Sequence, residues 1–396
     1  MVSSLQEKHG MFVSDQTKSD GVMERENLHV SRYSDSGVNR WHRAPMMVLF
    51  LLLFSFYLGL SGCHFSRDGG KEISGFTLLQ GMGGGEVKTI PFDSLIVADP
   101  FILADEATHT YYMTGSGGTL WKSTDLRTWE GPFSYIEIDT TSWMGSDPLI
   151  WAPELHHYKG KYYCFATFTN AEIVVDTVPE RCDVIRRGIH ILVAEQAEGP
   201  YRPMSETPYL PEEWSTLDGT LYEEEGVPYL VFNHDWMQLE YGQIKYIPLT
   251  ADLSRSDGMA TALFSGSDAP WPREMRSIGE LTFGMPLSGY VTDGPFLFKT
   301  GTGRLGMLWS SWSNKRYAQG VAYSLSGRLE GPWEQQAAPL VPENAGHGML
   351  FTTFDGKELL SLHAQPLGEN PGPRRPRLLE VDLTSDFLII KGRYNP

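Results

Sequence analysis

Three aspartates stand before short apolar segments, and together they could carry out acid–base hydrolysis. Asp99 is followed by Pro-Phe, Asp218 by Gly-Thr-Leu-Tyr, and Asp293 by Gly-Pro-Phe-Leu. Cleaving a glycosidic bond requires one carboxylic acid that protonates the leaving oxygen and one carboxylate that activates water or attacks the anomeric carbon. A third acidic group nearby raises the pKa of the acid by like-charge repulsion. Asp before Gly or Pro is also common in turns, so the chemistry depends on whether the three converge.

The elements that would bring these aspartates together are short strands. After Asp93, runs rich in Tyr, Phe, Trp, Val and Leu alternate with turn residues, and no long segment has a helical period. The sequence therefore predicts an all-β chain. A reversal containing Glu-Gly-Pro and an aromatic residue recurs at residues 129–133, 197–201 and 329–333. Such a turn also occurs in β-sandwiches.

Internal repeats of roughly 40 to 50 residues are typical of propellers and solenoids. We expect a five-bladed β-propeller, in which the first strand of each blade lines the central channel and the three aspartates meet there. The blades are expected near residues 94–140, 141–205, 206–270, 285–337 and 338–392.

The residues around these aspartates resemble glycoside hydrolase family 43, whose members are five-bladed propellers that act on arabinofuranosides, xylosides and related sugars. The resemblance rests on Ala98-Asp99-Pro100-Phe101, on Trp151-Ala152-Pro153-Glu154 followed by Lys159-Gly160-Lys161-Tyr162-Tyr163, on Leu217-Asp218-Gly219 with Val227-Pro228-Tyr229-Leu230, and on Gly346-His347-Gly348 with Asp355-Gly356 and His363. It implies that Asp99 is the general base and that Asp218 tunes and orients the acid. It also implies inversion of the anomeric centre, with acid and base carboxyls roughly 6.5 to 9.5 Å apart.

The general acid is the point where the chain departs from this family. The family usually has a glutamate before Gly-Pro in the fourth blade, where this chain has Asp293, one methylene shorter. Asp235 is the alternative acid, because the second strand of a blade returns to the face where the first began, and Glu240 is a weaker candidate. A protein that has lost the acid and retained only sugar binding is the other possibility.

Further candidate residues concern sugar and cation binding. Trp121, Trp151 and Trp309 are candidate stacking platforms for sugars, and Arg375 resembles an arginine of the fifth blade that contacts a sugar hydroxyl. The resemblance places His347 near the axis, where a structural calcium or sodium ion could bind. No HExxH motif or Cys/His cluster indicates a catalytic zinc, and no cofactor is required.

The N-terminal part indicates export. Residues 46–60 form an apolar run preceded by Arg40 and Arg43, as in a signal peptide. Leu60-Ser61-Gly62-Cys63 resembles a lipobox, so Cys63 would carry a lipid anchor at the bacterial outer membrane or cell surface; a transmembrane anchor without lipidation is the alternative. We expect residues 1–63 to be a polar stretch and signal segment, 64–92 a flexible tether, and 93–396 the propeller.

Charge narrows the choice of partners. The net charge of −17 argues against nucleic acid, which needs clustered Lys and Arg, and suits a neutral oligosaccharide or polysaccharide. The sequence therefore predicts a monomeric, exo-acting glycosidase that removes terminal arabinofuranosyl, xylosyl or related galactosyl residues. The alternatives are a non-catalytic carbohydrate-binding propeller and a surface scaffold for interactions with other proteins.

Overall fold

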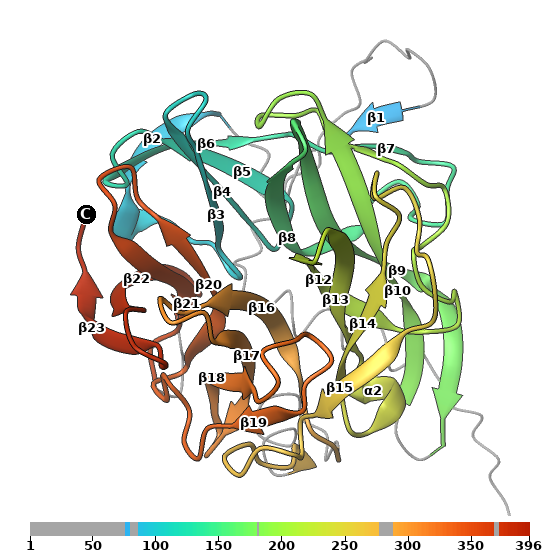
Figure 1. Ribbon diagram of the computed structural model, residues 1–396. Helices are drawn as coiled ribbons and strands as arrows, with labels where there is room; N and C mark the ends of the chain where they lie inside the picture. Colours follow the sequence, from blue (N-terminus) through green and yellow to red (C-terminus); the bar gives the residue numbers. More distant parts are fainter. Residues whose placement is uncertain (1–75, 80–85, 180–181, 277–287, 368–371) are drawn as a thin grey trace, which may run out of the picture. The chain divides into compact units, whose positions relative to one another are not determined.

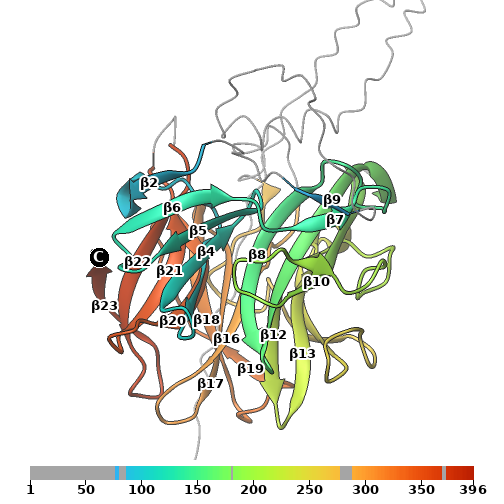
Figure 2. The same cartoon turned by 90° about the horizontal axis from the view of Figure 1, so that it is seen from above.

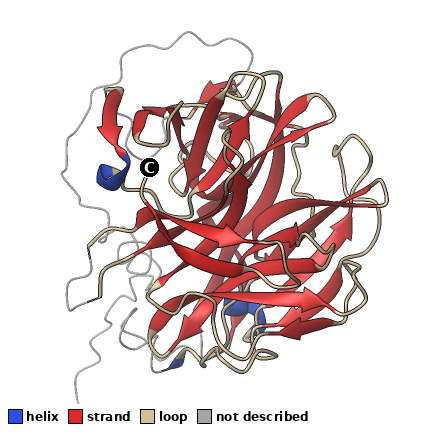
Figure 3. Cartoon of the chain, turned by 60° about the vertical axis from the view of Figure 1, so that its left-hand side comes forward, coloured by secondary structure: helices blue, strands red, loops and turns tan. Residues whose placement is uncertain are grey.

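The computed structural model describes residues 76–79, 86–179, 182–276, 288–367 and 372–396. The predicted signal segment and Cys63 lie outside these ranges. No helix within them is long and apolar enough to span a membrane. The prediction of an all-β chain is confirmed, since strands dominate the described residues (Figure 3).

Apart from the two-stranded sheet of β1 (Phe76–Leu78) and β7 (Glu137–Asp139), the described strands form five antiparallel blades arranged around a common axis (Figure 1). From the axis outward, blade 1 contains β3 (Phe101–Asp105), β4 (Thr110–Gly115), β5 (Thr119–Ser123), β6 (Thr128–Phe133) and β2 (Lys88–Pro91). Blade 2 contains β8 (Leu149–Tyr158), β9 (Lys161–Val178), β10 (Cys182–Ala194) and β11 (Arg202–Pro203). Blade 3 contains β12 (Thr216–Glu224), β13 (Val227–His234), β14 (Gln243–Pro248) and β15 (Thr261–Ser265).

Blade 4 contains β16 (Asp293–Lys299), β17 (Leu305–Ser313), β18 (Arg316–Ser324) and β19 (Trp333–Gln335). Blade 5 contains β20 (Ala345–Thr352), β21 (Glu358–Ala364), β22 (Arg375–Asp382) and β23 (Ile389–Tyr394). All these strands fall within the predicted blade ranges except β2, which precedes blade 1, and β23, which ends two residues late. A short parallel pairing of β18 with β20 joins the fourth and fifth blades into one sheet. The three recurring Glu-Gly-Pro reversals each contain a cis Gly-Pro peptide bond.

Part of the predicted tether is ordered into strands. Within residues 64–92, β1 (Phe76–Leu78) pairs with β7 (Glu137–Asp139), and β2 pairs with β6 as the outermost strand of blade 1. The strand β2 covers an edge that would otherwise expose unpaired backbone groups. Only Ile90 of β2 is even partly buried, so the segment has no alternating apolar pattern by which sequence could have revealed it.

Hydrophobic clusters between neighbouring blades hold the ring together. Separate buried clusters join blades 1 and 2, 2 and 3, 3 and 4, and 4 and 5, and a further one joins blade 5 to blade 1. In that last cluster, Phe351 and Leu359 pack with Met113 and Trp129. Because chain ends that are remote in sequence close the ring (Figure 2), the axis is a fixed place on which side chains from all five blades converge.

Each blade has one residue with positive φ within its innermost strand or, in blade 1, two residues before that strand. These are Asp99 (54°), Ala152 (39°), Asp218 (54°), Gly294 (51°) and His347 (56°). In blades 2 to 5 the position coincides with a register shift between the first two strands, such as that between Leu217 and Thr220. Bulges re-aim side chains and are common beside active sites. Strained non-glycine residues likewise gather at functional sites.

These positive-φ positions correct the prediction that the three aspartates occupy equivalent positions in their blades. Asp99 and Asp218 occupy the left-handed position of their strands, whereas Asp293 precedes it and Gly294 occupies it. The three are therefore not equivalent. Adjacent residues along a strand point to different sides, so Asp293 enters the site from another direction.

Candidate active site

The structure brings Asp99, Asp218 and Asp293 together at the axis. Oδ2 of Asp218 accepts a hydrogen bond from the N–H of Gly294 (3.0 Å), the residue after Asp293. Nδ1 of His347, from blade 5, lies 3.3 Å from Oδ1 of Asp99, in blade 1. All three carboxyls act electrostatically on His347. The convergence predicted from sequence is thus present in the fold.

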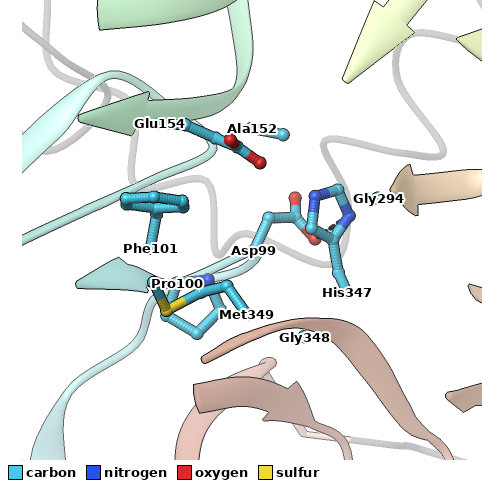
Figure 4. A pocket seen from close by; sticks show the side chains of 9 residues that line it. All are labelled: Asp99, Pro100, Phe101, Ala152, Glu154, Gly294, His347, Gly348 and Met349. Atoms are coloured by element: carbon cyan, nitrogen blue, oxygen red, sulfur yellow. Dashed lines mark ion pairs between the residues drawn. The ribbon is translucent and has the colours of Figure 1, made fainter. Parts of the chain in front are cut away.

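Asp99 is held in its ionised form. Burial, the largest single effect, raises the pKa of this carboxyl, but the charge of His347, the hydrogen bond and charge of His363 and the charge of Arg374 together outweigh burial and hold the pKa well below its usual range. Oδ2 also accepts a hydrogen bond from Oγ of Ser116 (2.5 Å). Figure 4 shows the Asp99 carboxylate directed at the His347 ring. An ionised, hydrogen-bonded carboxylate suits a general base.

Asp293 has the opposite electrostatic character. Burial, and secondly the charge of Asp218, raise its pKa to about 7. Its Oδ2 accepts a hydrogen bond from the hydroxyl of Tyr317 (3.1 Å). A carboxyl that retains its proton near neutral pH can donate that proton to a leaving oxygen.

Asp218 lies deep in the same site and is only 3% exposed. Its Oδ2 accepts hydrogen bonds from Nδ2 of Asn233 (3.2 Å) and from the N–H of Gly294. Burial raises the pKa of Asp218, and the charges of Asp99 and Glu154 act in the same direction, against the opposing effect of His347. Asp218 therefore adds negative charge beside Asp293 and orients the backbone that carries it.

Two histidines of blade 5 lie beside Asp99, and their pKa values are shifted in opposite directions. Burial alone would lower the pKa of His347, but the four surrounding carboxyls outweigh burial and raise the pKa above its ordinary value. For His363, burial lowers the pKa to about 4. Nδ1 of His363 lies 3.2 Å from the N–H of Asp99 and 3.0 Å from Oδ1. Nδ1 of His363 can form a hydrogen bond with only one of these two groups at a time. In the neutral ring it accepts from the backbone N–H of Asp99.

Glu154 is a site residue that the sequence prediction omitted. It lines the small axial cavity with Asp99, Phe101 and His347 (Figure 4). The side chain is 5% exposed, and Oε2 lies 3.1 Å from Nε2 of His156. The signal was present, because Glu154 ends the Trp-Ala-Pro-Glu motif and is a carboxylate that follows five apolar residues of β8.

Asp235, the alternative acid, has a structural environment. It caps the single-turn helix α2 (Trp236–Leu239) by accepting from the N–H of Met237. Its carboxylate also pairs with Arg187 and accepts from Oγ of Ser215 (3.0 Å). Glu240 follows as the last residue of this turn, with a φ of 67°. The described contacts of Asp235 are with these groups rather than with Asp99, Asp218 or Asp293.

Two of the three tryptophans predicted as sugar platforms are core residues. Trp309 is fully buried between blades 3 and 4, and Trp121 is 9% exposed between blades 5 and 1. That prediction is wrong for both, because no sugar ring can reach them. Trp151 is half-buried beside the axial ring, with the guanidinium of Arg187 lying 4.1 Å from its ring centroid. Its role in binding sugar stays a prediction.

The arginine near the carboxylates is Arg374 rather than Arg375. Arg375 donates to the backbone oxygens of Asp93 (3.2 Å) and Leu95 (3.0 Å), at the entry to blade 1. The charge of Arg374 acts on Asp99, and its guanidinium carbon lies 5.8 Å from the ring centroid of Tyr317. The prediction for Arg375 is therefore displaced by one residue, which reverses the direction of a side chain.

The predicted cation site stays a prediction. Within the described ranges no group of three or more His, Cys, Asp or Glu side chains is arranged to hold a metal ion. No catalytic step is assigned to a metal.

Known proteins similar to this chain are carbohydrate-active. The family model described as glycosyl hydrolases family 43 matches residues 89–387. The endo-arabinase from Bacteroides thetaiotaomicron VPI-5482 is 33% identical, with 77% of this chain and 99% of that chain covered and a TM-score of 0.63. No curated protein sequence matches.

Two more distant structures share the fold. The endo-1,4-beta-xylanase from Bacteroides thetaiotaomicron VPI-5482 is 22% identical, covering 78% of this chain and 100% of that chain, with a TM-score of 0.58. The alpha-L-arabinofuranosidase from Lactobacillus brevis is 16% identical, covering 78% and 99%, with a TM-score of 0.55. At these identities the likeness concerns the propeller fold alone.

Proposed function

The chain belongs to family 43 of the glycosyl hydrolases, and on that basis we propose that it hydrolyses terminal arabinofuranosyl linkages of oligosaccharides or polysaccharides with inversion. Terminal xylosyl linkages are the second candidate substrate class. The 33% identity to an endo-arabinase supports an arabinose-containing substrate.

In this mechanism, Asp99 removes a proton from water as the water attacks the anomeric carbon. Asp293 donates its proton to the glycosidic oxygen as the bond between that oxygen and the anomeric carbon breaks. Asp99 ends protonated and Asp293 ionised, and exchange with solvent restores both. Asp218 keeps Asp293 protonated beforehand through like-charge repulsion.

The observation that carries this proposal is the opposite protonation of two carboxyls in one buried site. His347, His363 and Arg374 together hold the pKa of Asp99 far below its usual range against burial, whereas burial and Asp218 raise that of Asp293 to about 7. Pairs of carboxyls whose environments separate their pKa values mark acid and base assignments. A scaffold for protein partners has no need of this arrangement.

The test is hydrolysis of linear arabinan, arabino-oligosaccharides and xylan by the purified full-length protein, with the anomer of the first product identified by NMR. Asp99→Asn and Asp293→Asn should each lower kcat/KM by roughly 10²- to 10⁴-fold. The control Asp257→Asn changes an exposed carboxylate and should retain activity. Retention of configuration in the product would contradict the inverting mechanism.

A non-catalytic sugar-binding protein is the second candidate, and the short side chain of Asp293 favours it. It predicts calorimetric binding of arabinan or xylan without release of reducing ends by the wild type. Turnover that disappears in Asp293→Asn excludes it.

We further propose that the protein is a monomer anchored at the cell envelope through a lipid on Cys63. If Cys63→Ser leaves processing and membrane attachment unchanged, the lipid anchor is wrong. Sedimentation of the solubilised protein tests the monomer.

A further inference from the structure

We propose that Tyr317 is the positioning residue of the general acid and fixes the transferable proton of Asp293 on Oδ1. The inference rests on the proposed glycosidase function. A phenol hydroxyl that donates to Oδ2 (3.1 Å) occupies that oxygen as an acceptor, so the carboxylic proton resides on the other oxygen. The third strand of the same blade, β18, thereby decides which oxygen of Asp293 faces the glycosidic bond.

Tyr317 is held rigidly enough to do this. The side chain is 5% exposed, and its ring stacks on His363 with centroids 5.3 Å apart and planes 6° apart. Its N–H donates to Oδ1 of Asn344 (3.1 Å). A Cβ at Gly346 would lie 2.7 Å from Cε1 of Tyr317, so the glycine makes room for the ring.

The same contacts connect the acid to the base. His363, on which Tyr317 stacks, touches Asp99 through Nδ1, so one stacked pair sets the positions of both carboxyls. An aspartate places its carboxyl one methylene closer to the backbone than glutamate. A fixed hydroxyl partner offers a physical reason why the shorter acid can work here, since it removes the rotational freedom of the carboxyl.

The charged and titratable groups that act on Asp293 come from several elements: Asp218 from β12, His347 from β20, Asp99 before β3, and Tyr317 from β18. Burial raises the pKa of Tyr317 well above its usual value, so the hydroxyl remains a donor. Its hydrogen bond favours the ionised form of Asp293. Tyr317→Phe should therefore shift the alkaline limb of the pH profile to higher pH.

The experiment compares Tyr317→Phe with wild type in the full-length chain. General-acid catalysis contributes roughly 10²- to 10⁴-fold, and we expect Tyr317→Phe to lose about ten- to a hundredfold of kcat/KM on arabinobiose. Loss on a dinitrophenyl arabinofuranoside, whose leaving group needs little protonation, should be smaller. Equal losses on both substrates with an unmoved pH profile would overturn the proposal.

Tyr323→Phe is the matched control. Tyr323 lies on the same strand, is 1% exposed, and its hydroxyl accepts from the N–H of Leu388 (2.8 Å), away from the site. It should lose stability without a leaving-group effect. If the wild-type protein hydrolyses neither substrate, the proposed glycosidase function is wrong. If the wild type hydrolyses them and Tyr317→Phe has the same kcat/KM and pH profile, only the role of Tyr317 is wrong.

A separate observation leads us to infer that Tyr241 and Tyr290 form a sugar-binding platform beside the acid. Their rings stack with centroids 5.7 Å apart and planes 17° apart, and Tyr241 is 48% exposed. Tyr290 precedes Asp293 by three residues, a span of at most about 11 Å. Tyr241 follows α2, at the end of blade 3 where Asp218 lies.

The backbone fixes this pair. The N–H of Tyr290 donates to the oxygen of Glu240 (2.9 Å), and that of Gly242 donates to the oxygen of Tyr290 (2.9 Å). A Cβ at Gly289 would lie 2.2 Å from the oxygen of Glu240, so this approach needs glycine. An exposed, rigid aromatic surface with hydroxyls suits the apolar face of a sugar ring next to the cleaved bond.

Tyr241→Ala tests the platform, with Phe387→Ala as a control that removes another exposed ring, 46% exposed and beyond β22 at the opposite end of its blade. Tyr241→Ala should raise KM for arabinan at least threefold, and more than KM for the aryl glycoside. Calorimetric arabinan binding to Asp293→Asn, with and without Tyr241→Ala, gives a readout independent of turnover. Unchanged affinity would overturn the platform.

Discussion

Nδ1 of His347 lies 3.3 Å from Oδ1 of Asp99, across the junction where the last blade meets the first. The contact joins residues from the two ends of the propeller, and it also lowers the pKa of the base. Closure of the ring and protonation of the site are therefore coupled.

The pH dependence follows from the two catalytic carboxyls. Asp99 must be ionised, and its lowered pKa keeps it so above about pH 4. Asp293 must be protonated, and its pKa of about 7 makes kcat/KM fall as pH rises through that value. A profile of kcat/KM from pH 4 to 9 checks this. An alkaline limb near pH 5 would contradict the assignment.

Asp218→Asn should move this alkaline limb to lower pH. The substitution removes a negative charge that raises the pKa of Asp293, so the acid loses its proton earlier. The shift has the opposite sign to that expected for Tyr317→Phe. A limb that stays in place would show that burial alone sets the pKa.

Stability should respond to Asp293 in a defined direction. The pKa of Asp293 is higher in the folded state than the ordinary value of 3.8. Its contribution to stability is therefore complete below pH 3.8 and is lost as pH rises through about 7. Asp293→Asn lacks this loss, so its Tm relative to wild type should increase from pH 4 to pH 8. A difference in Tm between Asp293→Asn and wild type that stays constant with pH would contradict a raised pKa for the buried Asp293 carboxyl.

Gly294→Ala should impair the site through His347. Gly294 has a φ of 51°, and an added Cβ would lie 2.9 Å from the His347 ring. Left-handed strain costs roughly 1–3 kcal/mol. Gly303→Ala is the control, because its φ is 86° and an added Cβ meets nothing within 4 Å. Both should lower the free energy of unfolding, but only Gly294→Ala should lower kcat; equal kcat values would refute the steric argument.

The pair between Arg187 and Asp235 should stabilise the fold. Both side chains are nearly buried, at 10% and 3% exposed, so Arg187→Met leaves a buried charge and should cost about 3–5 kcal/mol in urea unfolding. Removing the exposed pair through Arg255→Met should cost under about 1 kcal/mol. If Arg187→Met lowers the free energy of unfolding by a similarly small amount, the ion pair between Arg187 and Asp235 is not a buried, stabilising one.

Asp235→Asn then decides between the two acids. Asparagine can still cap α2, and Asp293 is unchanged, so the variant should retain the wild-type pH profile of kcat/KM even if its Tm falls. Loss of activity in a folded Asp235→Asn protein would transfer the role of acid to Asp235.

The sequence by itself determined the class of fold and singled out Asp99 as the residue proposed to be the base. Strand patterns are local, because alternating aromatic and β-branched runs between turn residues form strands wherever they lie. Repetition of those runs predicted the blades, and the motifs around Asp99 and Asp218 predicted convergence at the axis.

Only the tertiary structure decided how individual side chains are used. Trp309 and Trp151 are both aromatic strand residues, but Trp309 is buried against the neighbouring blade, whereas Trp151 is half-buried with the guanidinium of Arg187 against its ring. Asp235 is an acid near the correct end of a blade, yet Arg187 neutralises it from another blade. Glu154 lies in the site because blades 2 and 5 meet at the axis, and Tyr317 reaches Asp293 from β18 of the same blade. Burial, pairing and pKa are properties of that packing, and no local pattern encodes them.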